Sequence, residues 1–267
     1  MTEFITQYET PIRLGFFLGI FALMCVWEIL APKRDLTVSK ATRWLSNLSI
    51  VILNTLLLRL LFPAAAVGVA IVAQSNSWGL FNYFSVPGWL ALFLSVILLD
   101  MVIYWQHVFF HKIPVLWRIH RMHHADMDID VTTGSRFHPV EIILSMLIKF
   151  AIVIALGVPA VAVIVFEVIL NLTAMFNHSN VRLPLGLDKI IRLFIVTPDM
   201  HRVHHSVIPK ETNSNFGFNL SVWDKIFRTY KAQPDKGHLG MTIGLHEYRD
   251  EKVAERLPGM LMIPFKD

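Results

Sequence analysis

Five apolar stretches are long enough to cross a membrane, and they constrain the fold more than any other feature of the sequence. A span needs about 20 mostly apolar residues. The stretches run from Ile12 to Leu30, Trp44 to about Phe62, Trp89 to Trp105, Val140 to Gly157 and Pro159 to Phe176. A shorter run from Pro63 to Ala73 either continues the second stretch beyond a bend or forms a re-entrant piece. We therefore predict an all-α, polytopic integral membrane protein.

Composition agrees with this class. Apolar residues make up 54% of the 267 residues and charged residues only 16%, too few to give a soluble domain its polar surface. The single cysteine, Cys25, excludes an internal disulfide framework and a cysteine-rich zinc or iron–sulfur site. The net charge of +4 is modest, and in a membrane protein it indicates cytoplasmic loop residues, not nucleic-acid binding. The first apolar stretch lacks the features of a cleaved signal peptide, so we expect a retained anchor.

Basic residues in the loops predict how the spans are oriented. They follow the first span and surround the histidine clusters described below, whereas residues 74–88 contain no Lys or Arg. The residues counted are Lys33, Arg34, Lys40, Arg43, Lys112, Arg118, Arg121, Arg136, Arg182, Lys189, Arg192 and Arg202. The third span carries the chain to this basic side, and the fourth and fifth leave it and return. We therefore expect all the clusters on the cytoplasmic face.

Two charged residues interrupt the last two apolar stretches. Lys149 and Glu167 each lie nine residues from Val158, which is at the turn between the stretches. In an antiparallel hairpin the two side chains meet at equal depth, and pairing avoids the cost of an isolated charge inside the membrane. We therefore predict an ion pair. The alternative is a shallow hairpin in which Lys149 snorkels to water.

Eight of the twelve histidines fall into three tight clusters at the edges of these stretches. The clusters are His107-x-x-x-His111, His120-x-x-His123-His124 and His201-x-x-His204-His205. Imidazole is the commonest metal ligand among side chains. On a helix, the directions of residues four apart differ by about 40° around the helix axis, and the three rings of an HxxHH cluster span an arc of about 100°. The adjacent pair in such a cluster can therefore face different ions. The pattern favours a site for two metals.

The clusters and their surroundings resemble the fatty acid hydroxylase and sterol desaturase superfamily of integral-membrane oxidoreductases. The resemblance covers roughly residues 100–230 and rests on several motifs. These are His107-Val-Phe-Phe-His111, His120-Arg-Met-His-His124, Phe137-His138-Pro139, Asn177-His178-Ser179, Thr197-Pro-Asp-Met-His201-Arg-Val-His-His205, Asn215-Phe-Gly217, Trp223-Asp224 and Phe227-Arg-Thr-Tyr230. The last motif usually has Gly where this chain has Arg228, so the turn there could differ, although no ligand is lost.

The resemblance implies a di-iron centre (two Fe ions) that activates O2 on a lipid substrate. Carried over by position, nine histidines are ligands: His107, His111, His120, His123, His124, His178, His201, His204 and His205. His138 is a tenth candidate, with a supporting or structural role as the alternative because it belongs to no cluster and precedes a proline. His238 and His246 lie outside every motif, and we expect them to be ordinary surface residues. Imidazole alone does not select iron, so the metal's identity comes from the resemblance.

Other polar residues are candidates for supporting roles. Asp100 and Tyr104 lie on one stripe of the third span with His107 and His111. Tyr104 could bond near the ligands, and Asp100 could line a substrate channel, hold a neighbouring helix or serve packing. Ligating imidazoles usually donate their second N–H to a carboxylate or carbonyl. Acids close enough in sequence to accept it are Asp126, Asp128, Asp130, Glu141 and Asp199.

The resemblance therefore predicts an oxidoreductase that hydroxylates or desaturates a membrane lipid. The sequence has no flavin, haem or iron–sulfur motif, so we expect an external electron donor, namely a cytochrome, ferredoxin or reductase. The alternative is a membrane metal-binding protein or transporter, although transporters place their ligands near the bilayer midplane. We expect one functional domain, with membrane spans in residues 1–106, the catalytic region in 107–232 including the hairpin 140–176, and a tail in 233–267.

Overall fold

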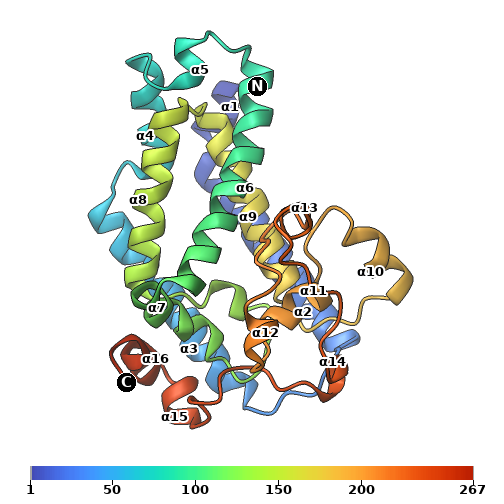
Figure 1. Cartoon of the computed structure of the whole chain (residues 1–267). Helices are drawn as coiled ribbons and strands as arrows, with labels where there is room; N and C mark the ends of the chain where they lie inside the picture. The colour runs from blue at the N-terminus through green and yellow to red at the C-terminus, as the bar shows by residue number, and fades with distance from the viewer. Residues whose placement is uncertain (1, 267) are drawn as a thin grey trace.

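The structure is a computed structural model that describes residues 2–266, and the regular elements in this range are all helices (Figure 1). Its described residues contain no named strand and only three isolated β-bridges. The long helices are α2 (Glu9–Leu30), α3 (Lys40–Leu61), α6 (Gly88–Lys112), α8 (Pro139–Leu156) and α9 (Ala160–Asn177). The shorter elements are α1 (Thr2–Gln7), α4 (Ala65–Ser75), α5 (Leu80–Tyr83), α7 (Pro114–His124), η1 (Thr133–Ser135), α10 (Leu185–Ile191), α11 (Pro198–His204), α12 (Pro209–Thr212), α13 (Val222–Ile226), α14 (Gly237–Gly240), α15 (Glu251–Ala254), α16 (Leu257–Met262) and η2 (Ile263–Phe265).

The five predicted spans are confirmed as helices long and apolar enough to cross a membrane. The second span continues past Pro63 into α4, so the 44 residues from Lys40 to Tyr83 form one candidate crossing unit. Large apolar side chains cover the outside of the bundle, including Ile29, Leu56, Leu60 and Phe93. Such a surface suits contact with lipid and not with water.

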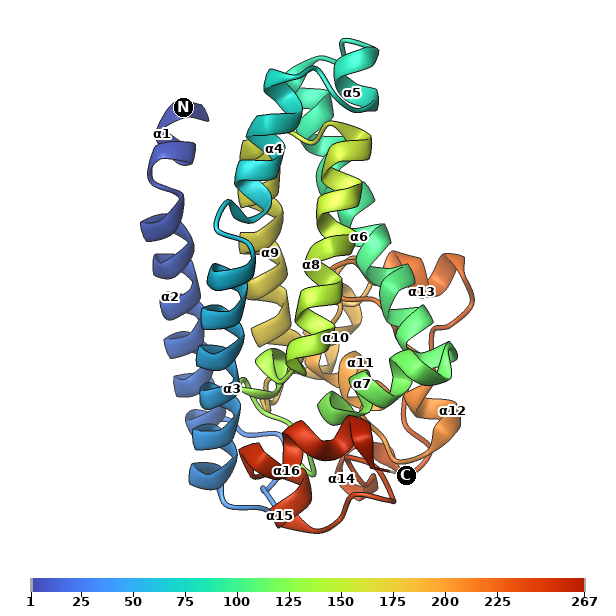
Figure 2. The same cartoon turned by 90° about the vertical axis from the view of Figure 1, so that its left-hand side faces the viewer.

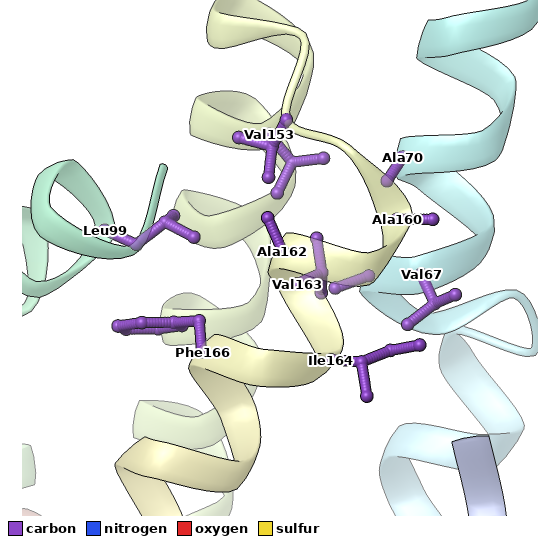
Figure 3. Packing of buried hydrophobic residues seen from close by; sticks show 11 residues of the cluster. Val67, Ala70, Leu99, Val153, Ala160, Ala162, Val163, Ile164 and Phe166 are labelled. Carbon is purple, nitrogen blue, oxygen red and sulfur yellow. The ribbon is translucent and has the colours of Figure 1, made fainter. Parts of the chain in front are cut away.

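Helix α9 is the centre of the bundle. In its most apolar 18-residue stretch 56% of the residues are buried, against 11–28% in the other four spans. Small residues such as Ala66, Ala70, Ala160 and Ala162 let α4 and α9 approach closely, and larger residues from α6, α8 and α9 fill the remaining space (Figure 3). Small contact residues are typical of helices that pack within lipid, where burial from water provides no driving force.

The hairpin of α8 and α9 has the predicted ion pair. Gly157 ends α8 in the left-handed conformation (φ 70°), and a Cβ there would lie 2.6 Å from Trp78 O. Lys149 Nζ lies 2.6 Å from Glu167 Oε1, so the prediction of pairing is confirmed. The sequence did not reveal a third member, Arg13 of α2, whose guanidinium lies 3.0 Å from Glu167 Oε2.

The segments after α9 and the end of the chain form a cap at one end of the bundle, and α1, α4 and α5 lie at the other end (Figures 1 and 2). The C-terminal tail packs tightly there, because Arg121 donates to Ile263 O (2.8 Å) and Arg136 pairs with Glu255 (2.9 Å). Met260 and Ile263 are fully buried. The tail is therefore an integral part of the structure around the histidines.

Candidate metal centre

Nine histidines converge at the capped end of the bundle. They form two groups, and within each group the potential ligand atoms all lie within 4.8 Å of one another. The five-histidine group consists of His107, His111, His120, His124 and His204, and the four-histidine group consists of His123, His178, His201 and His205. All are buried except His111, which is half-buried. These are the nine residues that the family resemblance selected.

Adjacent histidines face different groups, as the helical arcs predict. In α7, His120 and His124 belong to the five-histidine group and His123 to the four-histidine group. At the end of α11 the assignment is reversed, with His204 in the five-histidine group and His201 and His205 in the four-histidine group. The two HxxHH clusters therefore exchange roles, and each links both groups.

Helix starts and ends position these clusters. Helix α6 runs on to Lys112, which places His107 and His111 on successive turns with ring centroids 5.0 Å apart. Pro198 begins α11, where Thr197 caps the helix by accepting from Met200 N (3.3 Å). Proline in the first turn is favoured because it has no N–H to leave unpaired.

The spacing of the ring nitrogens fits metal ions. The Nε2 atoms of His107 and His204 lie 3.0 Å apart, and those of His178 lie 3.2 Å from His123 and 3.0 Å from His201. Ligand nitrogens held 2.0–2.1 Å from one ion at right or tetrahedral angles are about 2.9–3.4 Å apart. Both ring nitrogens of His205 are buried without a hydrogen-bond partner. In His107 and His204 both Nδ1 atoms face a carbonyl, so both Nε2 atoms carry lone pairs and a cation between them would be favourable.

Four grouped histidines outside the membrane helices, namely His178, His201, His204 and His205, are held in the neutral form. Burial lowers the pKa of His178 to about 4. Burial first and neighbouring imidazoles second hold the pKa of His201, His204 and His205 well below the ordinary value. Neutral imidazole is the form that binds metal, so these rings are prepared as ligands over the whole physiological pH range.

Backbone carbonyls and one carboxylate orient five of the nine rings. His107 Nδ1 lies 2.9 Å from Phe216 O, and His204 Nδ1 lies 2.7 Å from Ser214 O. In the other group, His178 Nδ1 lies 2.8 Å from Ala174 O. His120 Nδ1 instead contacts Glu141 Oε1 at 2.7 Å. An Nδ1–H donated in this way leaves Nε2 free to face an ion.

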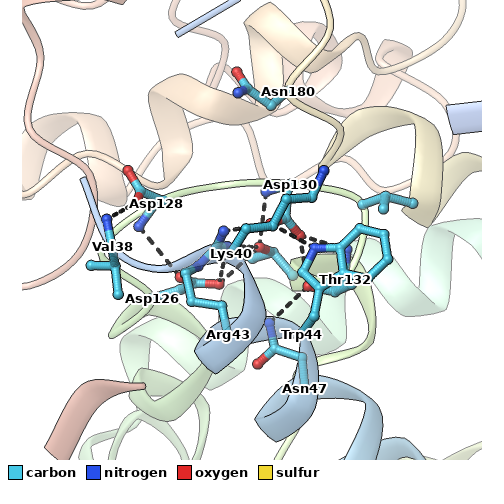
Figure 4. Close-up of polar contacts among 12 residues, drawn as sticks. Val38, Lys40, Arg43, Trp44, Asn47, Asp126, Asp128, Asp130, Thr132 and Asn180 are labelled. Atoms are coloured by element: carbon cyan, nitrogen blue, oxygen red, sulfur yellow. Dashed lines mark hydrogen bonds and ion pairs between the residues drawn. The ribbon is translucent and has the colours of Figure 1, made fainter. Parts of the chain in front are cut away.

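Of the five acids expected to accept from ligand imidazoles, only Glu141 does so. Asp126 and Asp130 bind Arg43, which Figure 4 shows between them. Burial alone would raise the pKa of Asp126, but Arg43 and Arg136 lower it well below its ordinary value. These two candidates do not take the role, because their partner comes from α3, more than 80 residues earlier.

The remaining two acids are also held elsewhere. Asp128 accepts from the backbone N–H groups of Thr37 and Val38, at 2.7 and 2.9 Å. Asp199 pairs with Lys33 (2.8 Å) and Arg202 (2.5 Å). Three of the basic residues that were counted to orient the spans are buried, namely Arg43, Arg136 and Arg202. These three do not act as free loop charges.

Asp100 and Tyr104 touch no histidine ligand. Asp100 accepts from Trp223 Nε1 (2.8 Å) and from two backbone N–H groups in residues 219–220. It therefore holds the loop before α13 against α6, which is the holding role the sequence left open. Tyr104 OH bonds Thr229 Oγ1 (2.9 Å), and Thr229 bonds Asp224 (2.6 Å).

The Asp224 carboxylate connects this arrangement to the five-histidine group. It accepts from the backbone N–H groups of Phe216 and Gly217, both at 2.8 Å, and the carbonyl of Phe216 contacts His107. Burial raises the pKa of Asp224 to about 6. Arg228, in the same turn, has a φ of +60°, which explains why the family usually has glycine there.

The other three histidines lie outside both groups. His138 caps α8 through Nδ1, which accepts from Val140 N (3.2 Å), and its Nε2 lies 3.3 Å from Leu261 O. Both ring nitrogens are occupied, so we assign His138 the structural alternative. His246 is exposed, as expected. His238 is not an ordinary surface residue, because its side chain is 9% exposed and lies 3.7 Å from Asp199.

A cavity of about 290 Å³ reaches both histidine groups from between the membrane helices. His107 and His120 of one group and His123 of the other line its end, next to Phe110 and Phe137. The cavity extends along α8 and α9 as far as Lys149 and Glu167. The sequence did not indicate this cavity, since its walls come from α2, α3, α6, α8 and α9.

Comparisons with known proteins agree with this arrangement. A family model for fatty acid hydroxylase matches residues 92–229. The chain is 28% identical to an ornithine lipid hydroxylase of Rhizobium tropici over 76% of its own length and 59% of that protein's. It is 30% identical to the alkylglycerol monooxygenase of Homo sapiens over 66% of its own length and 39% of the relative's. It is also 29% identical to the lathosterol oxidase of Mus musculus, over 54% and 47% of the two lengths.

The chain thus spans about half the length of these relatives. No solved structure is significantly similar to it. The family match includes both HxxHH clusters, His178 and the turn that contains Arg228. The chain belongs to the fatty acid hydroxylase family, within the fatty acid hydroxylase and sterol desaturase superfamily that its histidine motifs predicted.

Proposed function

We propose that this protein is an O2-dependent di-iron oxidoreductase that hydroxylates or desaturates a membrane lipid. The observation that carries the proposal is the cavity, which lies between membrane-length helices and is lined by histidines of both groups. A lipid in this cavity would place a carbon beside both groups without leaving an apolar environment. Relatives named as an ornithine lipid hydroxylase, an alkylglycerol monooxygenase and a lathosterol oxidase support oxidation of a lipid.

The nine grouped histidines are the proposed ligands, and they fit two ions better than one because they divide into two sets. Bound iron would supply the reductive activation of dioxygen that oxidation of an unreactive C–H bond requires. The protein's own contribution is to fix five of the nine rings, four through a backbone carbonyl and one through Glu141, and to exclude bulk water. Phe110 and Phe137 provide apolar cavity wall beside the histidines.

Glu141 is a candidate for handling a proton. Its Oε1 contacts His120, whereas its Oε2 is buried without a hydrogen-bond partner, and the residue lines the cavity. A carboxylate in this position can orient the imidazole and also accept a proton at Oε2. Tyr104 and Asp100 do not reach the cavity, and we propose that they position the loop that carries Phe216.

Turnover with O2 consumes two electrons from outside the protein, so we infer an external donor: a cytochrome, ferredoxin or reductase. We also propose that the histidine end of the bundle faces the cytoplasm. Basic residues exposed at that end support this orientation, namely Lys112, Arg118, Arg182 and Lys189. Their number is smaller than the sequence suggested, since several arginines are buried in ion pairs.

The proposal can be tested with protein purified from membranes, by measuring metal content and lipid products under isotopically labelled dioxygen. We expect two irons per chain, and either labelled oxygen in a lipid or a new double bond. His204→Ala should abolish product, and His246→Ala is the matched control because His246 is exposed outside both groups. Iron-loaded protein that changes no lipid would contradict the proposal. Metal transport into sealed vesicles would favour the transporter alternative instead.

A further inference from the structure

The cavity has a polar stripe along one wall, which is unexpected for a slot that holds only a hydrocarbon chain. Glu141, Ser145 and Lys149 all line it. They are four residues apart on α8 and therefore share one face. Eight residues of helix separate Glu141, beside the histidines, from Lys149, which corresponds to about 12 Å. Gln106 of α6 faces this stripe, since its Nε2 donates to Ser145 Oγ (2.8 Å).

The end of the cavity farther from the histidines carries an excess positive charge. Glu167 binds both cations there, with Lys149 at 2.6 Å and Arg13 at 3.0 Å. One carboxylate between two cations leaves a net charge of +1. Glu9 lies one turn from Arg13 on α2, but no ion pair joins them among residues 2–266. The three groups in direct contact, Lys149, Arg13 and Glu167, therefore carry a net charge of +1 between them.

This excess charge is costly within membrane-length helices, unless an occupant of the cavity offsets it. Lys149 and Arg13 line the cavity and retain N–H donors beyond those given to Glu167. The Lys149 side chain is 14% exposed and the Arg13 side chain 35%, so both can reach a ligand. A simple structural pair would need only Lys149 and Glu167.

We propose that Lys149 and Arg13 bind an anionic oxygen group of the lipid substrate, a carboxylate or a phosphate, and that Glu167 holds the two cations in place. This inference rests on the proposed function in calling the bound lipid a substrate. The anion-binding site itself is defined by the cavity alone. The anchor lies about 12 Å along α8 from the histidine end. It therefore sets which carbon of the chain lies beside the metals.

The test is direct binding to purified, metal-loaded protein in discs of uncharged lipid. Palmitate, hexadecanol and phosphatidylglycerol are the probes, so that a free carboxylate, a neutral head and a phosphate are compared. We expect wild type to bind at least one of the two anionic probes at least about tenfold more tightly than hexadecanol, which is the effect of one charge-assisted hydrogen bond. Palmitate or phosphatidylglycerol as the tighter ligand identifies the source of the anion.

Four variants separate recognition from structure. Lys149→Met and Arg13→Met each reduce the net charge of the cluster to zero, and we expect both to remove the preference for the anionic probe. Lys149→Arg should restore it. Glu167→Gln raises the net charge of the cluster to +2 and should keep the preference for the anionic probe. A purely structural role of the cluster predicts instead that this variant is the least stable of the set and that wild type shows no preference.

The readouts keep this inference separate from the enzymatic proposal. Equal binding of palmitate, phosphatidylglycerol and hexadecanol to wild type would overturn the anion site, even if the protein oxidises lipids. An intact preference in both Met variants would overturn it as well. Absence of turnover with a normal binding preference would contradict the proposed function and leave the anion site standing. Metal content, measured in every variant, confirms that the histidine groups remain assembled.

Discussion

The two histidine groups are built from the same motifs but have different surroundings. The five-histidine group takes two ligands from α6 and includes the half-buried His111, whereas the four-histidine group is completely buried and takes His178 from the end of α9. The loop 125–136 follows the histidines of α7 and is held by Arg43. Near the other HxxHH cluster, Asp199 precedes His201 and is surrounded by Lys33, Arg202 and His238. If both groups bind metal as we propose, the five-histidine group has a ligand to spare, whereas the four-histidine group depends on every ligand.

The largest effect should come from Arg43, whose network fixes the loop after α7. Arg43→Met leaves Asp126 and Asp130 buried without their main partner. Removing one member of a buried pair costs about 3–5 kcal/mol, so we expect a large loss of stability in detergent, measured by chemical denaturation. Arg59→Met is the matched control, since Arg59 is exposed on the same helix, and it should change stability by less than about 0.5 kcal/mol. Similar effects of the two changes would argue against a structural role for the network.

The next prediction contrasts the two groups directly. His178→Ala reduces the four-histidine group to three ligands, and His111→Ala reduces the five-histidine group to four. Loss of a residue that only hydrogen-bonds a metal ligand already lowers metal affinity about 10–100-fold. Loss of a direct ligand from a group without a spare one should therefore lower metal affinity by more than about 100-fold. We expect about one metal per chain in His178→Ala and two in His111→Ala, measured by elemental analysis. Equal losses in the two variants would remove the distinction between the groups.

The contrast between these groups also separates what the sequence could predict from what it could not. Spans, the Lys149–Glu167 pair and the division of adjacent histidines follow from hydropathy and helical periodicity, which are local properties. The carbonyls of Phe216 and Ser214 that orient His107 and His204 have no residue signature, because any residue has a carbonyl. Arg43, which binds Asp126, and Lys33, one of the two partners of Asp199, come from segments far away in sequence, and proximity along the chain did not identify them.

A smaller effect concerns the polar residues around Asp199, near the four-histidine group. Burial lowers the pKa of His238 to about 4, against the opposing effect of Asp199. Since the unfolded chain binds this proton near pH 6.5 and the folded chain does not, stability is present above that pH and falls between about 6.5 and 4. We expect a loss of about 1–2 kcal/mol between pH 7 and 5. Denaturation of His238→Gln should show a flatter pH dependence, and an unchanged profile would exclude His238 as the cause.

The smallest predicted effect concerns the turn that contains Arg228. This turn supports Phe216, whose carbonyl contacts His107 of the five-histidine group. Arg228 adopts a φ of +60°, and a non-glycine residue in the left-handed region costs about 1 kcal/mol. Glycine relieves this strain but gives the unfolded chain more freedom. We therefore expect Arg228→Gly to be neutral or to stabilise the protein by up to about 1 kcal/mol, whereas Arg228→Val should destabilise it because a branched side chain tolerates this conformation least. Thermal unfolding of both variants measures the difference. If valine is tolerated as well as glycine, the turn is relaxed, and support of His107 does not depend on its left-handed geometry.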